Sequence, residues 1–220
     1  MSIYNKIRNL LSLFYPARCI NCGEIVEDKY PFCNECLKIF KPKRRERFIE
    51  VNDKKIKCIS AFHYDGKIRE SICDFKFRDR KSYSKFFAES ISKVFIPEDR
   101  IKDFDYITAV PLSKQRYKER GYNQAEIVAK DLSKIINVEY FDILKKIKNN
   151  KIQHTLNLEE RKSNVKGVYA VQNEINIKNK KIILCDDIIT SGNTLSECVK
   201  MLFHLGSSEI ICVTTADASR

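Results

Sequence analysis

Hydrophobic residues near the C-terminus form two short runs on either side of a helical pattern. The aliphatic run within Lys181–Cys185 predicts a buried strand, which stops at two adjacent carboxylates, Asp186 and Asp187. Hydroxyl residues and a glycine follow, and the apolar spacing of Asn193–Leu205 then predicts a helix. A second apolar run, Glu209–Thr214, predicts another strand. The pattern therefore indicates a strand, a tight loop, a helix and a strand.

Strand and helix patterns also alternate upstream, which indicates a parallel α/β sheet with right-handed crossovers. Ile3–Phe14 places apolar residues on one helical face and predicts an amphipathic helix. Loops are expected at Lys76–Lys81 and Leu112–Gly121, and the polar stretch Lys145–Lys166 precedes a candidate hairpin strand at Gly167–Val171. The remaining predicted elements are strands at Cys58–Tyr64 and Tyr106–Val110 and helices around Ile68–Phe75, Phe86–Phe95 and Ala125–Ile136.

The loop after the carboxylates carries the groups that bind a sugar phosphate. In an open parallel sheet it lies at the carboxyl ends of the strands, where ligands bind, and free N–H groups at a helix start hold phosphate. Carboxylates are poor phosphate ligands but accept hydrogen bonds well from vicinal sugar hydroxyls. An ordinary strand–turn–helix unit is the alternative, which adjacent acids followed by Thr-Ser-Gly disfavour. The loop residues are Thr190, Ser191, Gly192, Asn193 and Thr194.

A second segment, Val110–Ala125, also lies between a predicted strand and a predicted helix. We therefore expect it on the same edge of the sheet as the acidic loop. Its cations Lys114, Arg116 and Arg120 can stabilise the charge that grows on a departing pyrophosphate. The alternative is a helix whose first turn carries solvated basic residues, and the pairing with the acidic loop favours the binding interpretation.

Four of the nine cysteines form two Cys-x-x-Cys pairs that are separated by ten residues. Four thiolates that converge on one point give a closed tetrahedral zinc site, which is structural because no coordination position stays open. Redox-active pairs are the alternative, but two pairs so close in sequence favour zinc. So small a module lacks its own core, and metal binding would supply much of its folding free energy. The predicted ligands are Cys19, Cys22, Cys33 and Cys36.

Length and charge narrow the class of protein. A chain of 220 residues fits one sizeable domain with a small appendage, which we divide into 1–50 and 51–220. The net charge of +12 fits a polyanionic partner or, equally, a lysine-rich solvated surface. The basic run Lys41–Arg47 is either a phosphate-contacting arm or, slightly favoured, a solvated junction between modules. No apolar run approaches the roughly 20 residues that cross a bilayer, so we expect no membrane span. The nine cysteines are odd in number and no signal peptide precedes them, so a disulfide framework is unlikely and we expect the reducing cytoplasm.

The pattern at Lys181–Thr194 resembles the motif that binds 5-phosphoribosyl-1-pyrophosphate (PRPP) in type I phosphoribosyltransferases. The segment Arg116-x-x-x-Arg-Gly-Tyr-Asn-Gln-Ala125 narrows the resemblance to the ComF family, phosphoribosyltransferase-like proteins linked to bacterial competence and DNA uptake. Where that family often has Arg and Thr in the lid, this chain has Lys148 and Asn150. Further matches are the four-cysteine module, Tyr64-Asp-Gly66 with Lys76-Phe77, and Gln153, Leu156, Arg161 and Asn164.

The resemblance implies a parallel-sheet type I phosphoribosyltransferase fold with a small N-terminal four-cysteine zinc module. It implies that Asp186 and Asp187 act in catalysis by binding the ribose hydroxyls of PRPP, while Thr190–Thr194 holds the 5′-phosphate. Mg²⁺ would accompany PRPP, and the acceptor of the phosphoribosyl group is not identified by the sequence. The cations expected at the pyrophosphate are Lys114, Arg116 and Arg120.

Two other functions stay open. The first is a non-catalytic protein of the DNA import machinery, which reuses the fold to handle single-stranded DNA or to partner a DNA-uptake helicase. The chain has no Walker A sequence, so it is not itself the ATP-driven motor. The second is a PRPP-sensing regulator, although no helix-turn-helix pattern is evident.

Overall fold

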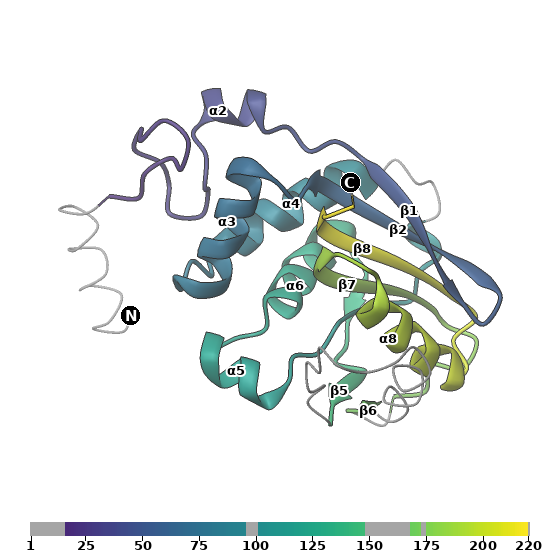
Figure 1. Cartoon of the computed structure of the whole chain (residues 1–220). Helices are drawn as coiled ribbons and strands as arrows, with labels where there is room; N and C mark the ends of the chain where they lie inside the picture. The colour runs from purple at the N-terminus through teal and green to yellow at the C-terminus, as the bar shows by residue number, and fades with distance from the viewer. Residues whose placement is uncertain (1–15, 96–100, 148–167, 173–174, 220) are drawn as a thin grey trace.

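The structure is a computed structural model that describes residues 16–95, 101–147, 168–172 and 175–219 (Figure 1). The helices are α2 (Asn34–Ile39), α3 (Gly66–Phe77), α4 (Tyr83–Phe95), α5 (Lys114–Arg120), α6 (Gln124–Ile136) and α8 (Asn193–His204), with a 3-10 turn at Ile101–Asp103. The strands are β1 (Arg45–Val51), β2 (Lys54–His63), β3 (Tyr106–Ala109), β4 (Glu139–Tyr140), β5 (Leu144–Lys146), β6 (Tyr169–Val171), β7 (Lys181–Ile189) and β8 (Glu209–Asp217).

Six strands form one sheet in the order β1-β2-β8-β7-β3-β4, and only the β1–β2 pair in it is antiparallel. Helices α4 and α6 pack together on one face, and α8 covers the other (Figure 1). Phe87, Ile91 and Leu132 are fully buried in the first core, and Leu195 and Val199 in the second. Covering both faces explains why β7 and β8 are mainly apolar. The predicted mainly parallel α/β sheet is confirmed.

Strand β7 continues past the predicted end at Cys185. Asp186 pairs in register with Thr214 of β8, and Ile188 pairs with Ala216. Ile189 is buried in the core under α8, so an apolar anchor follows the two acids and keeps the chain in the sheet. The predicted strand end was therefore wrong, and both carboxylates lie within the strand.

The predicted loop Leu112–Gly121 contains the short helix α5. Ser113 caps its start, where the Ser113 hydroxyl accepts a hydrogen bond from the Arg116 N–H at 3.3 Å. Gly121 ends the helix in the left-handed conformation at a φ of 75°. None of the seven helical residues is buried, so the sequence shows no apolar period there, and the loop prediction was wrong.

The basic run Lys41–Arg47 leads into β1, which forms one edge of the sheet. Arg44 donates a hydrogen bond to the carbonyl of Val94 at 2.9 Å, and Arg47 donates one to the carbonyl of Thr190 at 2.7 Å. The interpretation of this run as a solvated junction was therefore wrong for these arginines, because they hydrogen-bond other elements. A domain boundary at residue 50 stays a proposal, and β1 on its N-terminal side pairs with β2.

Several predictions concern residues outside the described ranges. They are the helix Ile3–Phe14, the lid positions Lys148 and Asn150, and the family residues within Gln153–Asn164. At the described ends of the lid segment, β5 pairs antiparallel with β6, as a hairpin requires. In the parts of the chain that the structure describes, every helix falls short of the length and apolar character needed to span a bilayer.

Candidate functional site

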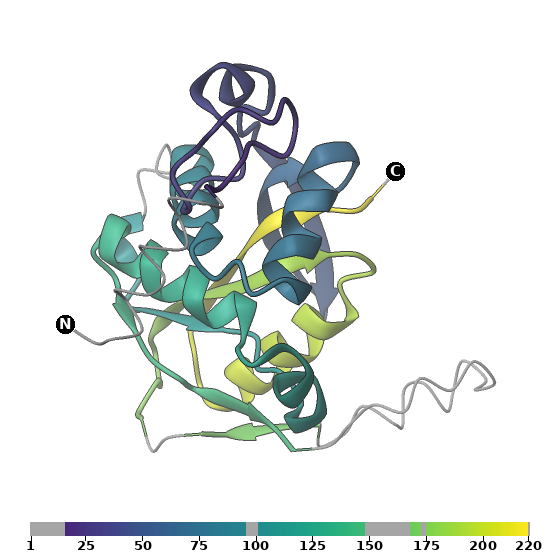
Figure 2. The same ribbon diagram turned by 90° about the vertical axis from the view of Figure 1, so that its left-hand side faces the viewer.

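Asp186 and Asp187 lie near the carboxyl end of β7, and cations from two helices approach them. Lys76 Nζ, near the end of α3, lies 2.8 Å from Asp187 Oδ2. Arg120 Nη1, at the end of α5, lies 4.0 Å from the same oxygen. The Lys76, Arg120 and Asp187 side chains are between 11% and 16% exposed, so solvent screens these charges only in part. Figure 2 shows the end of β7 between α3 and α5.

The surroundings of the acidic pair disfavour a negative charge on Asp186. Burial and the adjacent charge of Asp187 raise the pKa of Asp186 to about 8. The Asp187 N–H, which donates to Asp186 Oδ1 at 2.8 Å, and the two cations oppose this increase. Burial and the neighbouring carboxylate thus act against a second negative charge on the pair. Lys76 and Arg120 place two positive charges beside it, which favours an anionic ligand.

Contacts on two sides orient Arg120. Its guanidinium carbon lies 5.2 Å from the centroid of the Phe77 ring, and Nη1 donates to Gln124 Oε1 at 3.0 Å. Arg120 Nε is buried and has no hydrogen-bond partner within the described part of the chain. Such a buried donor beside the acidic pair suits a ligand with acceptor oxygens. Of the other predicted pyrophosphate cations, Lys114 and Arg116 lie exposed on α5.

Lys76 is a candidate functional residue that the sequence matched to the family in Lys76-Phe77 without indicating a role for it. A loop was expected from Lys76 onward, but α3 continues to Phe77. Lys76 follows the buried Ile72 by four residues, so helical spacing places it on the inner face of α3. A lysine at an apolar helix position was the signal that could have identified it.

The predicted phosphate loop lies around a hollow of about 40 Å³ that Asp186 and residues 188–195 line. Thr190, Ser191, Asn193 and Thr194 are exposed there. The hollow lies at the first turn of α8, a 12-residue helix whose N-terminal N–H groups can hold an anion. The structure thus brings the loop and one carboxylate of the pair to the same hollow.

Residues of the edge strand β1 hydrogen-bond and pack against this loop. Arg47 Nη1, which donates to the Thr190 carbonyl, also lies 3.3 Å from Asp217 Oδ1, a carboxylate on a side chain that is 4% exposed. Gly192 has a φ of 80°, and a Cβ added to it would lie 2.7 Å from Ile49 Cγ2. Glycine is therefore required at this position both for its backbone conformation and for its close packing.

The four predicted zinc ligands converge, with their Sγ atoms within 4.8 Å of one another. Burial opposes ionisation of Cys19, but backbone hydrogen bonds from Cys22, Cys33 and Asn21 lower its pKa to about 6. Asn21 Nδ2 donates to Cys36 Sγ at 3.3 Å, yet burial and the neighbouring thiols raise the pKa of Cys36 to about 12. Four sulfurs this close ionise together only beside a cation, so the tetrad fits structural zinc.

Comparisons with known proteins match two separate parts of the chain to known domain families. The phosphoribosyl transferase domain family matches residues 119–220, and the double zinc ribbon domain family matches residues 10–48. Competence protein F of Haemophilus influenzae is 28% identical over 197 residues, which cover 87% of this chain and 81% of that protein. DNA utilization protein YhgH of Escherichia coli K12 is 23% identical over 196 residues, or 87% of this chain and 80% of that protein. Adenine phosphoribosyltransferase from Thermoanaerobacter pseudethanolicus aligns at a TM-score of 0.42 with 15% identity, covering 84% of this chain and 99% of that chain.

The mainly parallel sheet and the matched domains define a protein with a phosphoribosyltransferase fold and an N-terminal four-cysteine zinc-ribbon module. More narrowly, the chain is similar over most of its length to the ComF/YhgH competence proteins. The family resemblance and the fold class that the sequence predicted are thereby confirmed.

Purified full-length protein is expected to contain about one zinc ion per chain, because four thiolates close one tetrahedral site. Cys22→Ser should release the metal and lower the thermal unfolding midpoint. Cys73→Ser changes a cysteine outside the tetrad and should keep the zinc. Mass spectrometry of the metal content checks both variants. A metal-free wild type, or full zinc retention by Cys22→Ser, would contradict the assignment.

Gly192→Ala should destabilise the fold by roughly 1–3 kcal/mol, because the added Cβ collides with Ile49 in a backbone conformation that alanine rarely adopts. Ile49→Ala removes the colliding methyl group, so the double variant should lose less stability than the two single losses added together. Gly121→Ala is the control, since its φ is 75° but its Cβ would meet open space. Urea unfolding measures all four variants. Strict additivity of Gly192→Ala and Ile49→Ala would rule out the packing contact.

Proposed function

We propose that the protein binds PRPP at the carboxyl end of β7. One arrangement carries the proposal: the acidic pair adjoins a hydroxyl-lined hollow, and two cations approach the pair from the other elements. A ribose with a phosphate at one end and a pyrophosphate at the other complements all three parts. The match of the phosphoribosyl transferase domain to residues 119–220 supports the same ligand.

In this proposal, each part of the site binds one part of PRPP. The ribose 2′ and 3′ hydroxyls hydrogen-bond the carboxyl groups of Asp186 and Asp187. The 5′-phosphate accepts hydrogen bonds from Thr190–Thr194, where the dipole of α8 adds positive potential. Because Asp186 lines the hollow beside the loop, one ribose phosphate can reach both groups.

Lys76 and Arg120 are proposed to bind the pyrophosphate. Without a ligand, Lys76 pairs with Asp187, and the Arg120 Nε has no partner within the described residues. Pyrophosphate oxygens can share these cations with the carboxylate, and charge on the leaving group strengthens the interaction. Lys114 and Arg116, which lie exposed on the same helix as Arg120, are proposed as outer contacts.

The proposed reaction is phosphoribosyl transfer to an acceptor that is not identified. The lone pair of the acceptor forms a bond to ribose C1, while the bond from C1 to the pyrophosphate oxygen breaks and its electrons leave with pyrophosphate. Asp186 and Asp187 orient the ribose, and the cations stabilise the leaving group, so the chain needs no nucleophile of its own. The oxygen ligands of the acidic pair fit Mg²⁺, which when bound with PRPP would supply further positive charge.

Calorimetry of the full-length protein with PRPP and Mg²⁺ tests the ligand. The wild type should bind, and Asp186→Asn/Asp187→Asn should weaken binding about tenfold or more, because the ribose hydroxyls lose carboxyl oxygens that accept their hydrogen bonds. Asp53→Asn, which changes an exposed carboxylate in the β1–β2 turn, should leave the affinity unchanged. Lys76→Met should weaken PRPP binding more than ribose 5-phosphate binding. Failure of the wild type to bind PRPP would refute the proposal.

A second candidate function is the handling of single-stranded DNA, alone or as the partner of a DNA-import helicase. Two observations favour it. The relatives are named Competence protein F and DNA utilization protein YhgH, and this chain has a net charge of +12. In this alternative, the phosphoribosyltransferase fold handles DNA and does not catalyse phosphoribosyl transfer. Titration of the purified chain with a labelled single-stranded oligonucleotide tests this function independently of the PRPP titration.

A further inference from the structure

Lys146 lies at the end of β5, on the face of this short strand that packs on the core under α8. It follows Leu144 by two residues, and Leu144 is buried in that core, so strand alternation places both on one face. Lys146 pairs in register with Tyr169 of β6, and its Nζ lies 5.6 Å from the centroid of the Tyr169 ring. Tyr169 and Cys198 of α8 are buried in the same core. The fold thus holds an ammonium group against a largely apolar surface.

The charged neighbours of Lys146 belong to the candidate PRPP site. Among the described residues, Lys146 interacts electrostatically with Asp186 of the acidic pair and with Arg116 of α5. Burial lowers the pKa of Lys146, and the like charge of Arg116 lowers it further, while Cys198 and Asp186 oppose the decrease. A half-buried lysine that faces a second cation beside an acidic pair is typical of a functional site.

No carboxylate pairs directly with either of these two cations. Within the residues that the structure describes, Lys146 and Arg116 have no carboxylate oxygen within 4.0 Å of their side-chain nitrogens. Glu119 follows Arg116 by three residues on α5, but it accepts a hydrogen bond from Gln115 Nε2 at 3.0 Å. A desolvated ammonium group without an ion-pair partner lowers the stability of the fold. The arrangement therefore suits an anion that a ligand supplies.

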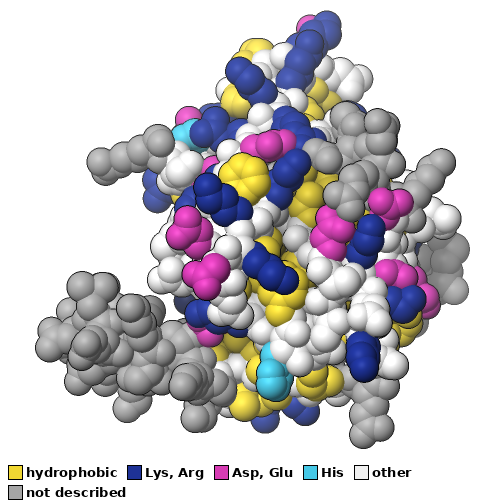
Figure 3. Space-filling model, turned by 90° about the vertical axis from the view of Figure 1, so that its right-hand side faces the viewer, with side chains coloured by type: hydrophobic (Ala, Val, Ile, Leu, Met, Phe, Trp, Pro, Cys, Tyr) yellow, Lys and Arg dark blue, Asp and Glu magenta, His cyan; other side chains and the backbone are white. Residues whose placement is uncertain are grey.

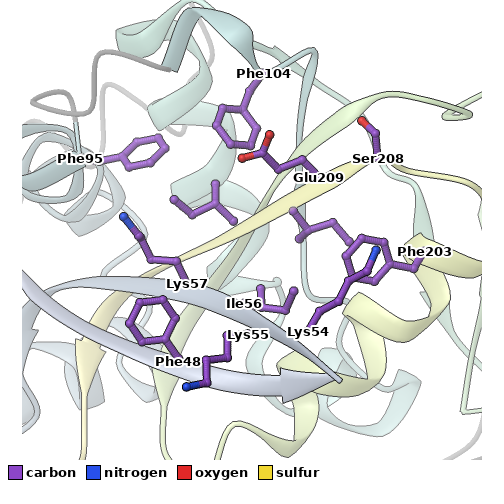
Figure 4. Close-up of a pocket in the computed structure, with 12 residues that line it drawn as sticks. Phe48, Lys54, Lys55, Ile56, Lys57, Phe95, Phe104, Phe203, Ser208 and Glu209 are labelled. Atoms are coloured by element: carbon purple, nitrogen blue, oxygen red, sulfur yellow. The ribbon is translucent and has the colours of Figure 1, made fainter. Parts of the chain in front are cut away.

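The lysines of a groove at the opposite end of the sheet differ in this respect. The groove, of about 470 Å³, lies at the amino ends of β2 and β8, and Lys54, Lys55 and Lys57 line it (Figure 4). Glu50 stands directly opposite Lys55 across the β1–β2 hairpin, and Glu209 also lines the groove. Figure 3 faces this end of the molecule and shows Lys and Arg side chains interspersed with Asp and Glu. The charges of this groove therefore give no reason to expect an anionic ligand there.

Lys146 and Arg116 extend the set of cations around the acidic pair. Arg116 and Arg120 are four residues apart on α5, so their side chains lie on one face of the helix. Arg120 approaches Asp187, whereas Arg116 interacts with Lys146, and Lys146 interacts with Asp186. Adjacent side chains of a strand point to opposite faces of the sheet, so cations approach the pair from both faces of β7.

We propose that Lys146, together with Arg116, binds the pyrophosphate of PRPP from the Asp186 side of the acidic pair, while Lys76 and Arg120 bind it from the Asp187 side. This inference rests on the proposed function and adds a binding residue to the same site. Pyrophosphate has enough oxygens to accept hydrogen bonds from both pairs of cations. Charge that grows on it as the bond to ribose C1 breaks strengthens these interactions.

Calorimetry of the full-length protein in the presence of Mg²⁺ compares the binding of PRPP with that of ribose 5-phosphate, which lacks the pyrophosphate. Lys146→Met should weaken PRPP binding about tenfold, because it removes a charge-assisted hydrogen bond, and should leave ribose 5-phosphate binding unchanged. Lys146→Arg keeps the charge and should restore most of the PRPP affinity. Lys145→Met is the matched control, since it removes the same charge from the neighbouring, exposed lysine and should change neither affinity.

Two outcomes would overturn the role of Lys146 and leave the PRPP site in place. One is wild-type PRPP binding that Lys146→Met does not weaken more than Lys145→Met does. The other is an equal loss of PRPP and ribose 5-phosphate binding in Lys146→Met, which indicates a structural role. Failure of the wild type to bind PRPP would instead refute the proposed function, and this inference with it. The unfolding midpoint of each variant shows whether its fold is retained.

Discussion

Two adjacent carboxylates on a largely buried strand require cations from elsewhere in the fold, and the candidate site depends on this requirement. Asp186 and Asp187 lie within β7, where desolvation disfavours two negative charges side by side. Lys76 and Arg120 come from α3 and α5, and they meet the pair because the sheet places the ends of these elements together. The cations that compensate the carboxylates are also those that an anionic ligand would use. One electrostatic constraint therefore serves both folding and the proposed binding.

The edge strand β1 adds a constraint of packing and hydrogen bonding. Arg47 ties the Thr190 carbonyl to Asp217, and Ile49 lies where any side chain at Gly192 would be. In sequence, β1 follows the zinc-binding module directly. Strand β1 thus links the N-terminal part of the chain to the predicted phosphate loop.

The elements that the sequence predicted correctly are those with a local signature. Aliphatic runs marked β3, β7 and β8, helical spacing marked α4, α6 and α8, and the cysteine spacing marked the four-cysteine cluster. Helix α5 was missed because none of its side chains is buried, and the end of β7 was misplaced because Asp186 and Asp187 interrupt an apolar run. The contacts of Lys76 and Arg47 could not be predicted because they join elements far apart in the sequence. Similarly, Lys114, Arg116 and Arg120 lie on one helix, but of these three only Arg120 lies beside Asp187 in the fold.

The most direct test of the charge-compensated acidic pair is a ¹³C NMR titration of the aspartate carboxyl groups, with Asp186→Asn used for assignment. Wild type should show an aspartate that titrates near pH 8. Lys76→Met should raise that value further, because it removes a stabilising cation. Since the folded pKa lies above that of the unfolded chain, stability should fall as the pH rises from about 4 to about 8, and less so in Asp186→Asn. An Asp186 that titrates near pH 4 in both proteins would contradict the account.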